Sequence, residues 1–163
     1  MQITNKFRLY PNKEQEEKLS KTLELCRQTY NILLNQLNNQ KEIDKAQIQG
    51  ILPDMKICDK ELKNVYSKTL QYECYRLFSN LQALRKSKEK RKVGRLRFKG
   101  KGWFKTFTYN QSGFKLTSDI LHLSKIGDIK IKVHREIKGK IKQITIKKMP
   151  SGKWFASIIE ERN

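Results

Sequence analysis

Hydrophobic residues recur with a strand period at the start of the chain and with a helix period directly after it. From Gln2 to Tyr10 apolar and polar side chains alternate, which predicts a strand with one buried face. Pro11 ends this strand, and Asn12 followed by Gln15 is the pattern of a capping box. A long amphipathic helix is predicted as far as about Asn39, because apolar residues recur at spacings of four and three in the stripe Leu19, Leu23, Cys26, Tyr30, Leu33 and Leu37.

A second long helical pattern follows after a weakly patterned connection. Apolar residues in 43–48 indicate a short helical piece before Gly50 and Pro53 interrupt it, and the pattern of residues 54–66 is ambiguous. The second long helix has a stripe that Tyr72, Tyr75 and Phe78 widen, and its members are Leu70, Cys74, Leu77, Leu81 and Leu84. We expect the two long helices to pack antiparallel, because their stripes match in period and length.

After Gly94 the hydrophobic period changes from that of a helix to that of a strand. Alternation predicts strands in residues 95–99 and 103–109, with Trp103 and Phe107 on one face, together with Tyr109, and Phe104 on the other. Further strand patterns, separated by turn residues, are Phe114 to Leu116, Ile120 to Leu123, Ile129 to Val133, Ile141 to Lys147 and Lys153 to Glu160.

These patterns predict an α+β fold. A small antiparallel, OB-like β-barrel would be interrupted after its first strand by a helical insertion, because the first strand precedes all the helical patterns and the other strands follow them. The barrel would consist of residues 1–10 and 95–163, and the helical lobe of residues 11–94.

The charge balance points to a polyanionic partner. The chain has 36 Lys and Arg residues against 16 Asp and Glu residues, a formal net charge of +20 in 163 residues. From Arg85 to Lys101 ten cationic residues stand against one acidic residue, Glu89. A solvated tail is one interpretation of such a run, but the apolar residues inside it and directly after it, Trp103 among them, favour a nucleic-acid contact. The run divides at Gly94, so we interpret it as a seam between the two lobes.

Catalytic, metal and membrane chemistry find little support in the residues. Cys26, Cys58 and Cys74 form no C-x-x-C pair, so we expect no disulfide framework, no metal site and no cofactor. The acidic residues are scattered and His122 and His134 stand apart, so we expect no catalytic residues. No apolar run approaches the length of a spanning helix and the start lacks the pattern of a signal peptide, which predicts a cytoplasmic, nucleoid-associated location.

Candidate nucleic-acid contacts fall into three classes. Cationic side chains that would contact phosphates are Arg8, Arg95, Arg97, Lys99, Lys101 and Lys105. Aromatic side chains that would stack on bases, unless they fill the barrel, are Trp103, Phe104, Phe107, Tyr109 and Trp154. Polar residues of the long helices that would read base edges are Arg27, Asn31, Gln71 and Arg76.

Five segments resemble, in order and spacing, the amino-terminal half of TnpB proteins, the OrfB-type proteins of insertion sequences. They are FRLYPNKEQEEKL, CRQTYN, LQYECYRLFSNLQALR, GRLRFKGKGWFKTFTY and LHLSKIGDIKIKVHREIKGKIKQITIKKMPSGKWFASIIEE. TnpB proteins are RNA-guided nucleases similar to the ancestors of type V CRISPR effectors. The resemblance covers essentially the whole chain.

The resemblance implies a wedge-like barrel and a helical recognition lobe that together hold a guide RNA and recognise target duplex DNA and its short flanking motif. Tyr30 and Asn31 lie in CRQTYN, and Arg97, Phe98 and Lys99 lie in RLRFKG. The resemblance therefore implies nucleic-acid contact for those of these five residues whose side chains are exposed.

The resemblance also limits the expected activity. Family members continue into a RuvC nuclease domain with an acidic triad, and usually a zinc ribbon, whereas this chain ends at Asn163. We therefore expect nucleic-acid binding without catalysis, with guide RNA and target duplex DNA as partners. A separate RuvC nuclease half is a further candidate partner. Two alternatives remain open: a stand-alone DNA-binding regulator that uses the helical lobe, and one half of a split RNA-guided DNA endonuclease.

Overall fold

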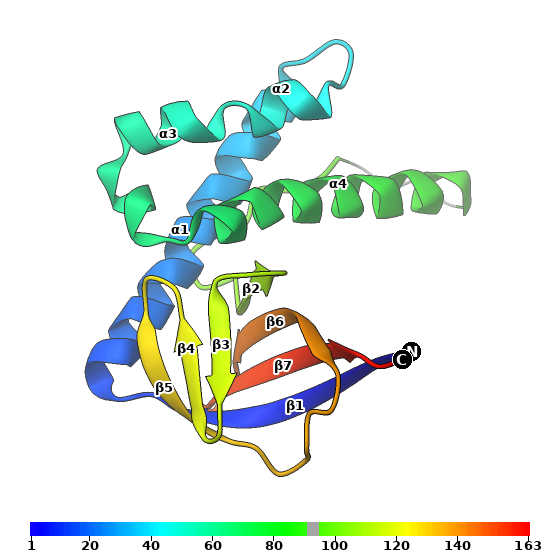
Figure 1. Ribbon diagram of the computed structural model, residues 1–163. Helices are drawn as coiled ribbons and strands as arrows, with labels where there is room; N and C mark the ends of the chain where they lie inside the picture. The colour runs from blue at the N-terminus through cyan, green and yellow to red at the C-terminus, as the bar shows by residue number, and fades with distance from the viewer. Residues whose placement is uncertain (91–94) are drawn as a thin grey trace.

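The protein consists of a β-barrel and a helical lobe that leaves the barrel after the first strand (Figure 1). The computed structural model describes residues 1–90 and 95–163, without the side chains of residues 88–90. The predicted division of the basic run at Gly94 lies outside the described residues. All described helices lie within residues 13–90, and all described strands lie before or after them.

Seven antiparallel strands form a nearly closed barrel, which confirms the predicted fold class. In spatial order the sheet runs β2-β6-β7-β1-β5-β4-β3. The strands are β1 (Gln2–Tyr10), β2 (Thr106–Asn110), β3 (Phe114–Thr117), β4 (Ile120–Leu123), β5 (Gly127–Lys132), β6 (Lys140–Lys148) and β7 (Trp154–Glu161). The first strand lies at the centre of this order, between β5 and β7, so the barrel is built around it.

Alternation along the strands fills the barrel. On β1 the inward side chains Phe7 and Leu9 are fully buried, and their partners on β7, Ala156 and Trp154, are buried as well. Burial of apolar area of this kind is the main stabilising contribution to such a fold. The outward residues of the same strands, among them Arg8, stay at least partly accessible.

The helical lobe contains two long helices and three short ones. They are α1 (Lys13–Asn38), α2 (Lys45–Gln49), α3 (Leu52–Cys58), the 3-10 helix η1 (Lys60–Asn64) and α4 (Ser67–Lys90). The capping box at Asn12 and Gln15 is confirmed, since each side chain bonds the other residue's backbone N–H. Cys26 and Cys74 are buried in the core as predicted, and all three cysteines are free.

The predicted antiparallel pairing of the two long helices is wrong. In Figure 1, α4 crosses α1 instead of running back along it. Around the crossing, Asn80 of α4 donates a hydrogen bond to the Tyr30 hydroxyl of α1 at 3.0 Å. The crossing turns one side of α4 toward β2. Much of the Tyr75 side chain on this helix stays in solvent.

The predicted strand in residues 95–99 does not form, and the second strand begins only at Thr106. The backbone of this segment bonds to side chains of α1 instead of to a neighbouring strand. Consequently Trp103 does not share a face with Phe107 and Tyr109: its side chain is 66% exposed, whereas both of theirs are buried.

The turn between the edge strands β2 and β3 contains a glycine, Gly113, whose replacement tests how tightly this part of the barrel is packed. Gly113 has φ +88°, and a Cβ atom there would lie 2.5 Å from Cε2 of Tyr66. We expect Gly113→Ala to lower the free energy of unfolding by about 3 kcal/mol or more, from backbone strain and overpacking together. Gly152 is the matched control, because its φ is +87° but nothing lies within 4 Å of its Cβ position. Gly152→Ala should cost only about 1 kcal/mol in the same chemical denaturation experiment, and equal losses would contradict the steric argument.

Candidate nucleic-acid interface

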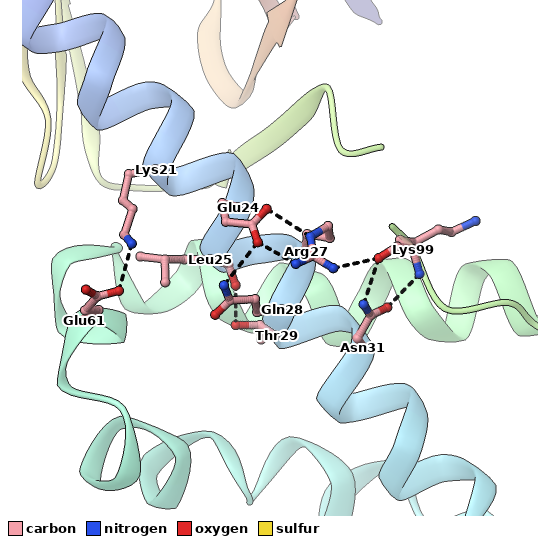
Figure 2. Close-up of polar contacts among 9 residues, drawn as sticks. All are labelled: Lys21, Glu24, Leu25, Arg27, Gln28, Thr29, Asn31, Glu61 and Lys99. Atoms are coloured by element: carbon pink, nitrogen blue, oxygen red, sulfur yellow. Dashed lines mark hydrogen bonds and ion pairs between the residues drawn. The ribbon is translucent and has the colours of Figure 1, made fainter. Parts of the chain in front are cut away.

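The segment that connects the lobes is held on α1 through the backbone of Lys99 (Figure 2). Asn31 donates to the Lys99 carbonyl at 2.9 Å and accepts from the Lys99 N–H at 2.8 Å. Arg27 donates a further hydrogen bond to the same carbonyl at 2.8 Å. Three bonds to one residue fix the path of the basic segment over the helix, and the lysine side chain points away from them.

A carboxylate keeps Arg27 in this position. Glu24 lies one turn earlier on α1 and accepts from Nε of Arg27 at 2.9 Å, and it also accepts from Gln28. The hydrogen bond from Arg27 is the main reason that the pKa of Glu24 is lowered to about 2. Glu24 is therefore ionised at neutral pH, and it orients the guanidinium toward Lys99.

A second connection between the lobes is aromatic. Phe104 is buried against Tyr30 of α1, edge to face, with ring centroids 5.7 Å apart. The guanidinium of Arg76, on α4, lies over the Phe104 ring, 4.5 Å from the ring centroid. The same guanidinium donates a hydrogen bond to the carbonyl of Thr106 at 3.0 Å. Arg76 thus links α4 both to the connecting segment and to the second strand.

A groove runs between α4 and the outer faces of β2 and β6. Three adjoining hollows of about 440, 210 and 510 Å³ form it. The first two share Tyr72 and Tyr75, and the last two share Arg76, Asn80 and Thr106. The groove is therefore continuous from the beginning of α4 to the segment that contains Trp103.

The floor and walls of the groove are polar near its middle, where Arg76 is the one charged side chain among the residues that line the middle hollow. Threonines on neighbouring strands line it, since Thr106 and Thr108 of β2 lie beside Lys147 and Thr145 of β6. The helix contributes side chains one turn apart, which are Gln71, Tyr72, Tyr75, Arg76, Ser79 and Asn80. Amide and hydroxyl groups of this kind can pair with base edges, and exposed aromatic rings can stack on bases.

Cationic side chains stand at both ends of the groove. Lys45 and Lys68 line one end. Lys99, Lys105 and Lys147 line the other, with Trp103 between them. No acidic side chain lines any of the three hollows among the residues that the structure describes. The groove therefore suits a ligand with negative charge along its length and polar groups in the middle.

One acidic side chain lies directly behind the groove. Glu73 of α4 is completely buried, and its nearest cation is Arg76, with 3.4 Å between a carboxylate oxygen and Nε. Burial outweighs the attraction of Arg76 and raises the pKa of Glu73 from 4.5 to about 8. Glu73 is therefore mostly protonated at neutral pH.

A separate cationic surface covers the outside of the barrel. Strand pairing sets Arg8 of β1 between Phe155 of β7 and Lys132 of β5. Lys6 lies 4.5 Å from the centroid of the Phe155 ring, and Arg8 lies 5.0 Å from that of Tyr10. Cations that rest on aromatic rings in this way keep their charge facing solvent.

The structure divides the candidate residues that the sequence suggested. In the groove lie Gln71, Arg76, Lys99 and Lys105. Exposed on the connecting segment lie Arg95, Arg97, Phe98 and Lys101, and Arg8 lies on the barrel surface. Three aromatic candidates are buried, so their rings are not accessible for stacking on a base: Tyr30, Phe104 and Trp154.

Arg27 and Asn31, suggested as base readers, bond to the backbone of Lys99 instead. Both are only partly exposed, and their polar groups are used inside the protein. These two residues therefore hold the connecting segment in place on α1.

Sequence reasoning missed residues of both groove walls. Tyr75 looked like part of the apolar stripe of α4 but is 56% exposed, because the crossing of α1 and α4 buries a narrower stripe than the pattern suggested. On the strands, Thr106, Thr145 and Lys147 are outward positions that face α4. Alternation could have placed them outward, but only the chain path shows that a helix lies opposite them.

Glu73 gives a test of the buried charge that needs no ligand. The native carboxyl holds its proton up to about pH 8, whereas the unfolded carboxyl loses it near the ordinary pKa of 4.5, so the free energy of unfolding falls as the pH rises between these values. Glutamine does not titrate. We expect Glu73→Gln to stabilise the protein by roughly 4 kcal/mol at about pH 8 and by little at low pH.

Chemical denaturation as a function of pH checks this expectation. Glu17→Gln is the matched control, since Glu17 is exposed on α1, and it should change stability by less than about 0.5 kcal/mol at every pH. A loss of stability in Glu73→Gln at about pH 8 would show that the carboxylate is needed for folding.

No helix in residues 1–90 or 95–163 is long and apolar enough to cross a membrane. The same residues contain no group of three or more His, Cys, Asp or Glu side chains that could hold a metal ion.

Comparison with known proteins gives one match. No curated protein matches the chain. Residues 1–43, which comprise β1, α1 and the start of the following loop, match the family HTH_OrfB_IS605, described as a helix-turn-helix domain. The start of the chain is therefore similar to the N-terminal region of OrfB/IS605 transposases of the TnpB type, and this similarity indicates the DNA-binding part of a transposon-associated protein.

Proposed function

We propose that this chain is the nucleic-acid-binding half of a TnpB-like transposon protein, which holds a guide RNA and recognises target duplex DNA with its short flanking motif. The observation that carries the proposal is the groove between α4 and the strands β2 and β6, with cations at both ends and amide, hydroxyl and aromatic groups between them. The family match to residues 1–43 supports the transposon context.

In this proposal a DNA duplex lies along the groove and is read from one side. Lysines at its ends would contact phosphates, which position the duplex without reading its sequence. Gln71, Tyr75 and Ser79 stand one turn apart on α4 and would approach base edges. In an RNA-guided system most of the sequence is read by base pairing, so a few such contacts are enough for a flanking motif.

The barrel surface offers a second track for the RNA. Arg8, Lys6 and Lys132 lie on the outside of the central strands, and Lys147 continues the row across β7 to the edge of the groove. An RNA backbone on this surface and a DNA duplex in the groove would lie side by side at Lys147. This arrangement would bring a guide close to the strand with which it pairs.

We assign binding and not cleavage to these residues. The proposal leaves open a partner that supplies a RuvC nuclease half, with which this chain would form a split RNA-guided endonuclease. Mixing the chain with such a half, guide RNA and target DNA tests this alternative, and the absence of cleavage would remove it.

A second candidate function is that of a DNA-binding regulator that needs no RNA. The description of the matching family as a helix-turn-helix domain favours it. The two candidates differ in their nucleic acid. Purification of the chain from its own cells, followed by sequencing of the nucleic acid that accompanies it, should yield one discrete RNA if the first proposal is right. A footprint on duplex DNA without any RNA would support the regulator instead.

The cations at one end of the groove predict the salt dependence of binding. We expect the combined change Lys99→Gln, Lys105→Gln and Lys147→Gln to weaken the binding of duplex DNA about tenfold or more at moderate salt. Each lost phosphate contact should also reduce the slope of log K against log salt by about one unit. Fluorescence anisotropy titrations at several salt concentrations measure both effects.

The matched control removes the same charge elsewhere. Lys13, Lys41 and Lys63 are exposed and line none of the three hollows, so their combined change to glutamine should weaken binding much less. Equal losses in the two triple variants would mean that the chain attracts nucleic acid by its net charge alone.

A further inference from the structure

We propose that Glu73 is a positioning residue that sets the charge Arg76 presents to nucleic acid. A protonated Glu73 leaves the guanidinium free to meet a phosphate in the groove, and an ionised Glu73 holds it, so that binding takes up a proton. The inference rests on the proposed function, because it assumes that nucleic acid occupies the groove.

The position of Glu73 is unusual for a carboxylate. Its side chain is fully buried, and neither of its oxygens has a hydrogen-bond partner among the residues that the structure describes. The 3.4 Å separation from Nε of Arg76 allows charge attraction but does not make a hydrogen bond. A buried carboxylate without donors is held in its neutral form, so the carboxyl responds to any change of charge nearby.

Arg76 connects this carboxyl to the groove. Its Nε faces Glu73, while its Nη2 donates to the carbonyl of Thr106 at 3.0 Å on the strand that forms the groove floor. The arginine lines two of the three hollows, at the place where they join, and its side chain is 20% exposed. A phosphate in the groove would therefore meet the outer edge of the same guanidinium that Glu73 faces from inside.

No other described group competes for this role. From α1, Cys26 and Tyr30 face Glu73, and burial raises the pKa of both, so they remain neutral where Glu73 titrates. From α4, Tyr72 also lies near, and burial raises its pKa too. Arg76 is the one charged group in the described part of the chain that acts on the pKa of Glu73.

The sign of the coupling follows from the charges. The pKa of Glu73 is about 8 in the free protein, so the carboxyl is mostly neutral at lower pH. A phosphate near Arg76 adds negative charge, which disfavours the ionised carboxyl and raises its pKa further. Binding therefore takes up a proton between the pKa of the free protein and that of the complex, and affinity falls as the pH rises through about 8.

The test is the pH dependence of binding by the full chain. The probe is a short fluorescein-labelled DNA duplex of random sequence, titrated at fixed ionic strength from about pH 6.5 to about pH 9, below the range of ordinary lysines. For the native chain we expect the Kd to rise about fivefold over this range, as repulsion between one phosphate and the ionised Glu73 carboxylate, with Arg76 between them, implies. For Glu73→Gln we expect a Kd close to the low-pH value at every pH, since the amide stays neutral.

Glu17→Gln controls for the loss of an acidic residue as such, and it should follow the native chain. A second measurement needs no variant: calorimetric titration of the native chain near pH 8, in buffers with different heats of ionisation, should show uptake of a fraction of a proton for each duplex bound.

The outcomes separate this inference from the proposed function. If the native chain binds the duplex with the same pH dependence as Glu73→Gln, this inference is wrong and the proposed function still stands. Weaker binding by Glu73→Gln at every pH also overturns the inference, because the neutral form should then be sufficient. A native chain that binds no duplex at any pH, even at low salt, overturns the proposed function and this inference together.

Discussion

The attachment of the Lys99 backbone to α1 is the interaction on which the candidate interface depends. Asn31 satisfies both the N–H and the carbonyl of this residue, and Arg27 adds a bond to the carbonyl. Side chains thereby supply the bonds that a neighbouring strand would otherwise make, so the cationic segment can cross from one lobe to the other as an ordered but irregular chain. Trp103 and Lys105 reach the groove because their backbone is fixed here.

The buried carboxyl of Glu73 behind the groove costs stability, and the proposed binding function would account for it. Replacing a buried carboxylate with a neutral group usually stabilises a protein, and nothing in the packing around Glu73 calls for an ionised side chain. The proposed coupling to Arg76 gives this position a use, because the arginine would meet a changing charge. An energetically unfavourable residue behind a surface that suits an anion is therefore consistent with a binding site and hard to explain as part of the core.

Sequence patterns predicted the barrel better than the interface. The strands from Gln2 to Tyr10 and from Ile120 to Leu123 have the predicted ends, because alternation and turn residues are local signals. Residues 95–99 alternate equally well, yet their partner is a helix side chain, and no local signal distinguishes the two. The crossing of α1 and α4 likewise depends on contacts between distant residues. Net charge located the basic segment, but only the fold shows that Arg27 and Asn31 hold it while Tyr75 faces solvent.

The central position of the first strand has a consequence for synthesis of the protein. β1 pairs with β7 along almost its whole length, from Gln2 opposite Glu161 to Leu9 opposite Trp154. The barrel therefore cannot close on the ribosome until the last strand has emerged, although the helical lobe, whose contacts are more local, can fold much earlier. Until then the apolar face of β1 remains uncovered. A nascent chain would carry a finished helical lobe on an unfinished barrel, and the outer surface of the barrel would take its final form only after translation of this region is complete.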